Sequence, residues 1–139
     1  MPPTRARNTY LSNAVASAPP ERLLTMLYDG LVNNIAMAED AMERRDYFRL
    51  NELLVNSQEM VLALQGTLKP ELWSGGASLM AIYTYVYRLL VRGNTQKDPG
   101  ALSEARKLLE PLQEAWHKAA EQVLTERASA HVSGLAASA

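Results

Sequence analysis

Cysteine is absent from this chain of 139 residues, and its absence removes several kinds of chemistry at once. Without a thiol the chain cannot form a disulfide, offer a thiolate ligand to a metal or use a cysteine nucleophile. An excess of charge of one sign is also missing, because 14 basic and 15 acidic side chains are interspersed along the sequence. No run of lysine or arginine forms the basic patch that nucleic acids require. We therefore predict that nucleic acid is not a partner.

Long apolar runs are missing as well. No apolar stretch approaches the ~18–20 residues that a transmembrane helix needs, and Met1 to Arg5 lack the apolar region of a secretory signal. These observations predict a protein that is not inserted in a membrane and that works in the cytoplasm. The length fits one domain with a hydrophobic core of its own.

The first 18 residues are small and polar and show no sustained periodicity. This pattern predicts a flexible N-terminal arm over residues 1–18, with two conspicuous side chains, Tyr10 and Leu11. Pro19 and Pro20 end the arm, because proline suits the first turn of a helix, where its missing N–H would be unbonded anyway.

Four stretches with apolar residues three or four positions apart follow, which predicts four amphipathic helices. They run from Pro20 to about Arg45, from Asp46 to Lys69, from about Ala77 to Val91 and from about Ala101 to Arg127. Their short connections predict an all-α fold, an antiparallel four-helix bundle over residues 19–127. From Ala128 the composition falls mainly to alanine, serine and glycine, which predicts a disordered tail over residues 128–139.

Several residues are typical of helix ends. Asp46 is a good N-cap for the second helix, and Ser74 or Ser78 could cap the third. Gly93-Asn94 tolerates left-handed geometry and is expected to close the third helix. Pro111 is expected to bend the fourth helix without dividing it.

Apolar side chains are shared unequally among the four helices. They cover roughly two-thirds of the circumference of the first and third helices, whereas a helix on the outside of a bundle needs a stripe of only ~100° or somewhat more. Either these two helices are unusually buried or they hold a surface for a partner. Six tyrosines against one phenylalanine favour a partner, because tyrosine is typical of interfaces that are part buried and part wet.

A helical bundle can hold an active site, but the residues that would build one are missing. Carboxylate-bridged metal bundles need two Glu-x-x-His motifs, and this chain has one, Glu114 to His117, on the polar side of its helix. No serine stands in a Gly-x-Ser-x-Gly elbow, and Gly75-Gly76 lacks the lysine spacing of a phosphate loop. Asp29 has no second titratable group on its face, and Gly30 is expected to admit a close neighbour. We predict no catalytic residue, metal or cofactor, and a solvated His117.

The most specific motif lies where the arm meets the first helix. Tyr10, Val15 and a stretch of small residues lead into the sequence Pro20-Glu21-Arg22-Leu23-Leu24-Thr25-Met26-Leu27-Tyr28-Asp29-Gly30. This pattern closely resembles the opening of the flagellar secretion chaperones of the FliS family. The likeness covers residues 10 to about 125 and continues in order at Gln58 to Val61, Ile82 to Val86 and Ala115-Trp116. Pro19, where the family often has a capping serine, and Pro111 depart from the family pattern.

The resemblance implies a non-catalytic chaperone that binds flagellin in the cytosol. Its client is the C-terminal segment of flagellin, which is disordered alone and becomes helical around the bundle. Binding would prevent premature polymerisation and keep flagellin competent for flagellar type III secretion. Tyr10 and Leu11 would cover part of the client surface until flagellin displaces them. The other candidate partner-binding residues lie on the first and third helices: Leu24, Tyr28, Leu31, Ile35, Ile82, Tyr83 and Val86.

Other interpretations of the surplus apolar arcs stay open. A structural protein could use them to form a homo-oligomer, and a bundle enzyme or carrier could hold an apolar ligand between the first and third helices. Binding to a membrane surface is the weakest alternative, because the apolar faces lack the flanking basic residues that such helices use. The resemblance also leaves room for a second partner, such as a flagellar export-gate component or a flagellar regulator.

Overall fold

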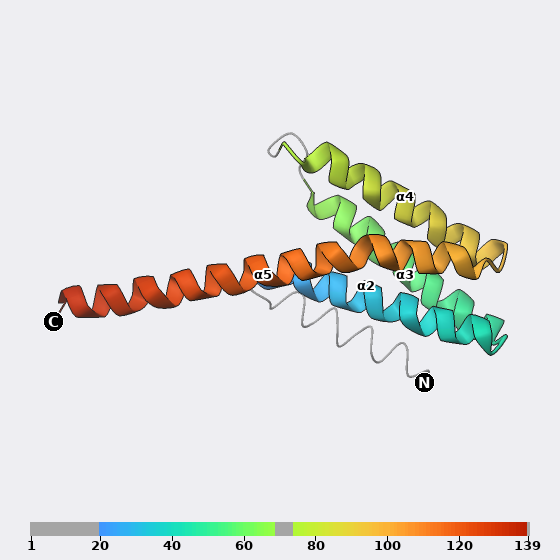
Figure 1. Cartoon of the computed structure of the whole chain (residues 1–139), viewed down its shortest axis with the longest axis horizontal. Helices are drawn as coiled ribbons and strands as arrows, with labels where there is room; N and C mark the ends of the chain where they lie inside the picture. The colour runs from blue at the N-terminus through green and yellow to red at the C-terminus, as the bar shows by residue number, and fades with distance from the viewer. Residues whose placement is uncertain (1–19, 69–73, 139) are drawn as a thin grey trace.

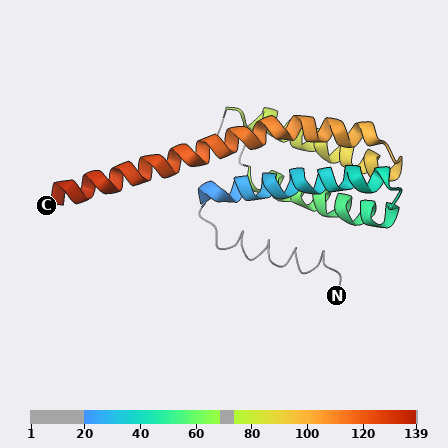
Figure 2. The ribbon, with the colours of Figure 1, turned by 60° about the horizontal axis from the view of Figure 1, so that its bottom comes forward.

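The computed structural model describes residues 20–68 and 74–138, and the regular structure in these ranges is entirely helical. Its elements are α2 (Pro20–Glu43), α3 (Tyr47–Thr67), α4 (Gly76–Thr95) and α5 (Pro99–Ser138). Successive helices run in opposite directions (Figure 1). Both α2 and α4 pack against α3 and α5, so α2 and α4 occupy one diagonal of the bundle and α3 and α5 the other (Figure 2). The predicted all-α antiparallel bundle is confirmed.

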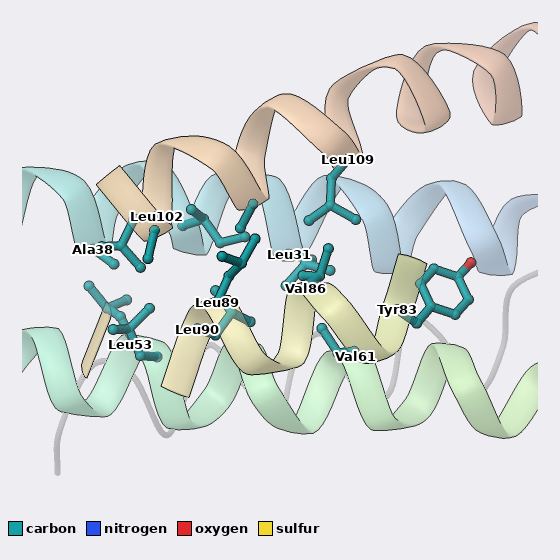
Figure 3. Close-up of a cluster of buried hydrophobic side chains, with 14 of the residues drawn as sticks. Leu31, Ala38, Leu53, Val61, Tyr83, Val86, Leu89, Leu90, Leu102 and Leu109 are labelled. Carbon is teal, nitrogen blue, oxygen red and sulfur yellow. The ribbon is translucent and has the colours of Figure 1, made fainter. Parts of the chain in front are cut away.

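The core lies between the four helices, where aliphatic side chains from all of them converge (Figure 3). Helical periodicity explains which side chains are inside, since residues three or four positions apart share a face. In α3 the buried side chains follow this spacing: Leu50, Leu53, Leu54, Ser57, Val61 and Leu64. The Ser57 hydroxyl donates to the Leu53 carbonyl at 2.7 Å, so the polar member of this face is hydrogen-bonded.

A tight turn joins α2 to α3. Arg45 has a φ of 56°, a left-handed conformation that glycine most often adopts at the ends of helices. Its amide donates to the Met42 carbonyl at 3.1 Å. The Asp46 amide donates to the Ala41 carbonyl at 2.9 Å, which completes a Schellman motif. The Asp46 carboxylate accepts from the Arg49 amide at 3.2 Å, so the predicted N-cap of α3 is confirmed.

The start of α4 differs from the prediction. Gly75 holds the N-cap position and makes no side-chain capping bond. The expected serine cap, at Ser74 or Ser78, is therefore wrong. The helix gains its stability from packing against α3 and α5 rather than from a cap, as is usual for helices inside a bundle.

The end of α4 also differs, because Gly93-Asn94 lies inside the helix, which continues to Thr95. The predicted closing role of this pair is wrong. A Cβ atom at Gly93 would clash with Cδ2 of Leu102, so the glycine allows α4 and α5 to approach each other closely. The left-handed residue of this connection is Lys97, with a φ of 52°.

Asp98 begins α5. Its carboxylate accepts from the amides of Gly100, at 3.0 Å, and Ala101, at 3.4 Å. Pro99 occupies the first helical position, where its missing N–H costs nothing. The helix then continues through Pro111, so the prediction of one helix rather than two is confirmed.

The last part of α5 differs from the expected disordered tail. The helix extends to Ser138 and projects beyond the bundle (Figures 1 and 2). Alanine has the highest helix propensity, and adding residues to an existing helix needs no new nucleus. Both effects favour helix over the segment from Ala128 to Ser138, although its side chains from Ala128 to Gly134 are exposed. The predicted arm, residues 1–18, lies outside the described residues.

Candidate partner-binding surfaces

Five of the predicted partner-binding residues belong to the core. Their side chains are at most 1% exposed: Tyr28, Leu31, Ile35, Tyr83 and Val86. In this conformation they stabilise the bundle and present almost no surface to a partner, so their role in binding stays a prediction. Leu24 and Ile82 are half-buried and reach the surface. Tyr10 and Leu11 lie outside the described residues.

The position of α2 and α4 on one diagonal explains why their wide apolar arcs are filled. Each of these helices packs against both α3 and α5 and also faces the other across the core. The hydroxyls of Tyr28 and Tyr83 meet across this diagonal at 2.6 Å, with ring centroids 6.3 Å apart. Burial raises the pKa of both hydroxyls above the usual value for tyrosine. Of the two explanations for the surplus, unusual burial accounts for most of it.

Polar contacts hold α2 and α5 together. The Arg106 guanidinium donates to both carboxylate oxygens of Glu39, which raises the pKa of Arg106. Nearer the start of α2, Asp29 accepts from Gln113 at 2.8 Å and lies 2.7 Å from Nε2 of His117. His117 is an exposed surface residue, as predicted, and it also contacts Asp29, so Asp29 has a titratable neighbour that was not predicted. The sequence separation of 88 residues hid this contact.

Helix α3 has two contacts, with α2 and with α4, and both are closely packed or hydrogen-bonded. A Cβ atom at Gly30 would lie 2.7 Å from Cε of Met60, so Gly30 admits a close neighbour from α3 as predicted. Amide and hydroxyl groups join α3 to α4. Asn94 donates to Asn51 at 2.8 Å, and Gln65 donates to the Thr84 hydroxyl at 3.2 Å.

The fourth contact, between α4 and α5, leaves apolar surface uncovered. The Tyr85 hydroxyl donates to the Glu104 carboxylate, which raises the pKa of that hydroxyl. On α4, Ile82 lies one turn before Tyr85. On α5, Leu108 and Leu112 lie four and eight residues after Glu104. Tyr85 is 41% exposed, and the aliphatic side chains beside it are half-buried. We call the set Ile82, Tyr85, Leu108 and Leu112 the α4–α5 seam.

Trp116 continues α5 one turn beyond this seam. Its side chain is partly buried against the core, and its indole acts on the Tyr28 hydroxyl, lowering the pKa of Tyr28 against the larger, opposite effect of burial. Because Nε1 is buried, Trp116 belongs to the core around Tyr28 rather than to the surface of the seam.

A second apolar surface lies on α3, where sequence reasoning predicted only a narrow buried stripe. Phe48, Val55 and Leu62 are 78%, 42% and 52% exposed. They are seven residues apart, so they form a row on the side of α3 opposite the core, which we call the α3 stripe. The seven-residue spacing of these three residues is the signal in the sequence that marks the row.

Metal clusters and membrane-spanning helices are both absent from the part of the chain that the structure describes. Residues 20–68 and 74–138 contain no group of three or more histidine, aspartate or glutamate side chains placed to hold a metal ion. None of the helices in these ranges combines the length and the hydrophobicity of a membrane span. What the geometry provides is uncovered apolar surface on a packed helical bundle.

The sequence matches a known protein family. The family model described as flagellar protein FliS matches residues 3–123. The chain belongs to the FliS family. It is 36% identical over 125 residues to the flagellar secretion chaperone FliS of Bacillus subtilis, an alignment covering 90% of this chain and 91% of that protein. It is 31% identical over 110 residues to the FliS chaperone of Salmonella typhimurium, covering 76% and 80%.

Membership in the FliS family confirms two predictions. The resemblance noted at the Met-Leu-Tyr-Asp-Gly motif was correct, and the protein is a flagellar secretion chaperone rather than an enzyme. Within that motif, the structure assigns distinct packing roles to three residues. Tyr28 bonds to Tyr83 in the core, Asp29 pairs with His117 on α5, and Gly30 lets Met60 of α3 approach.

Proposed function

We propose that this chain is a cytoplasmic chaperone that binds the C-terminal helical segment of flagellin. Binding covers the segment that flagellin needs for self-assembly, which prevents premature polymerisation and keeps the subunit competent for export. The observation that carries the proposal is the half-buried apolar band of the α4–α5 seam. It is supported by the membership of the chain in the FliS family. An amphipathic client helix covers such a band with side chains at i, i+3 and i+4.

One candidate residue from the sequence lies in the seam, and a second lies on α2. Ile82 was among the candidates from the sequence and lies within it. Leu24 of α2 is also half-buried, and we include it in the client surface.

The arm completes the proposal. Tyr10 and Leu11 act as a placeholder that flagellin displaces. Deletion of residues 1–18 should leave the bundle folded and increase the association rate with flagellin, because displacement no longer precedes binding. Stopped-flow fluorescence with the flagellin segment measures this rate, and an unchanged rate would count against the placeholder role.

Titration calorimetry of the full chain against a peptide of the C-terminal segment of its own flagellin tests the function. We expect one-to-one binding with a negative heat-capacity change, the signature of apolar burial. Ile82→Asp and Tyr85→Ala should each weaken binding by about tenfold or more. Tyr85 is exposed enough that its replacement leaves the fold intact, as circular dichroism can verify.

Leu62→Asp on the α3 stripe is the matched control, and this variant should bind the flagellin segment as the unmodified chain does. The absence of binding at high concentration would contradict the proposed function. Equal weakening by the seam variants and the control would contradict the seam. Sedimentation of the free chain checks the remaining alternative, in which apolar surface closes a homo-oligomer.

A further inference from the structure

We propose that the α3 stripe is a docking site for an amphipathic helix of a second protein, one with basic residues beside its apolar positions. Phe48 and Leu62 are 14 positions apart, a distance of about 21 Å along α3. This length equals about four helical turns, and Val55 lies midway between the two. The stripe therefore matches a helix with apolar side chains at a seven-residue spacing.

One edge of the stripe is acidic. Glu52 and Glu59 lie on the side of the stripe that faces α2, and within residues 20–68 and 74–138 neither carboxylate has a hydrogen-bond or ion-pair partner. The nearest basic residue on that side is Arg49, whose Nη2 lies 3.8 Å from Sδ of Met37 on α2. Two uncompensated carboxylates beside exposed apolar side chains favour a partner that brings cations.

At the C-terminal end of α3, the acidic edge has free space around Gly66. Gly66 follows Glu59 by seven residues, so it lies in the same row. No described atom would lie within 4 Å of a Cβ at this position, and φ at Gly66 is not positive. Neither internal packing nor backbone geometry requires a glycine here, although glycine weakens a helix. Together with the exposed Ala63, Gly66 lets a partner helix approach closely.

A second copy of the chain fits this edge poorly. If two α3 helices paired antiparallel about Val55, the two-fold symmetry would bring Glu52 of one copy toward Glu59 of the other. Parallel pairing would place the acidic edge against Asn51, Gln58 and Gln65, which carry no charge. Neither arrangement gives the carboxylates a cation, whereas a basic helix does.

The stripe is separate from the α4–α5 seam. Helix α3 lies diagonally opposite α5, and the stripe is on its outward face. Flagellin on the seam and a second helix on α3 can therefore be bound at the same time. The inference does not depend on the proposed function, since it rests on the charge and exposure of α3 alone.

Fluorescence anisotropy with two labelled peptides tests the proposal on the full chain. Both probes have three heptads with leucine at the a and d positions. One carries lysine at e and g, and the other carries glutamate at those positions. We expect the lysine probe to bind about tenfold or more tightly than the glutamate probe. Leu62→Asp should abolish binding of the lysine probe.

Charge exchange provides the decisive variant. Glu52→Lys combined with Glu59→Lys should reverse the preference between the two probes. Glu121→Lys combined with Glu126→Lys makes the same change in net charge on the exposed part of α5, so this control should keep the original preference. If both double variants weaken the lysine probe equally, or if Leu62→Asp leaves its binding unchanged, the proposal is overturned.

A final titration separates this proposal from the flagellin proposal. Saturation of the chain with the flagellin segment should leave the affinity for the lysine probe unchanged. Displacement of the probe would assign the α3 stripe to the flagellin site and overturn the proposal of a second partner. Probe binding by a chain that does not bind flagellin would support the α3 proposal and contradict the proposed function.

Discussion

Helices α2 and α3 both carry many apolar residues, but the two helices differ in how much of that apolar surface is buried. The apolar arc of α2 is wide, and its centre is filled by the core, where Leu31 and Ile35 are fully buried. The buried stripe of α3 is narrow, yet Phe48 and Leu62 are more than half exposed on its opposite side. The number of apolar residues on a helix therefore does not show which surface is free. Position relative to the neighbouring helices decides it.

The largest expected effect separates the two helices directly. Leu31→Ala should lower the free energy of unfolding by about 2–5 kcal/mol, because it opens a cavity in the core. Leu62→Ala makes the same chemical change on the exposed side of α3 and should alter stability by no more than about 0.5 kcal/mol. Urea denaturation measures both. If both variants lost a similar free energy of unfolding, the proposed difference in burial between Leu31 on α2 and Leu62 on α3 would be wrong.

A smaller effect is expected from the diagonal contact of α2 with α4. Tyr28→Phe removes one hydroxyl and leaves that of Tyr83 buried without its partner, at a cost of about 1–3 kcal/mol. The double variant Tyr28→Phe/Tyr83→Phe removes both groups and should cost less than the sum of the two single variants. Additive losses in this double-mutant cycle would show that the hydroxyls do not interact.

Alkaline pH should weaken the same contact. Burial raises the pKa of Tyr28 and Tyr83, so the folded state retains protons that the unfolded state loses above about pH 10. Stability is full below that pH and falls above it, by up to about 1.4 kcal/mol per pH unit for each tyrosine. Unfolding curves at pH 9 to 11 should show this fall, and the double phenylalanine variant should show less of it.

The smallest effect is expected at the turn between α2 and α3. Arg45 adopts a left-handed conformation that is costly for a residue with a Cβ atom. Arg45→Gly relieves this strain and should raise the free energy of unfolding by up to about 1 kcal/mol. Thermal denaturation checks the sign, with Arg44→Gly as the control that should destabilise, since the Arg44 amide makes a helical bond to the Asp40 carbonyl and glycine has a low helix propensity. A lower melting temperature for Arg45→Gly would contradict the strain.

Local patterns in the sequence predicted the fold well. Periodicity located all four helices, and the chemistry of Asp46 located a cap, because both depend on neighbours in the chain. Features that depend on distant residues were missed. Gly93 was predicted to end a helix but provides room for Leu102, and the contact of the exposed His117 with Asp29 was not predicted.

The partner surfaces were harder to predict for the same reason. Periodicity places Tyr28 and Leu24 on one arc, but only the packing of α3, α4 and α5 shows that Tyr28 is enclosed and Leu24 is half-buried. The α3 stripe could have been found from its seven-residue spacing. Recognising it required knowledge of which side of α3 meets the core.

Thiol labelling tests the central claim most directly, because the natural chain has no cysteine to interfere. Three single variants report on the core, the seam and the stripe: Leu31→Cys, Ile82→Cys and Leu62→Cys. We predict that the thiol at 31 reacts slowly throughout, that the flagellin segment protects the thiol at 82, and that the thiol at 62 reacts rapidly with or without flagellin. Rapid reaction at 31, or protection by flagellin at 62 and not at 82, would contradict the account.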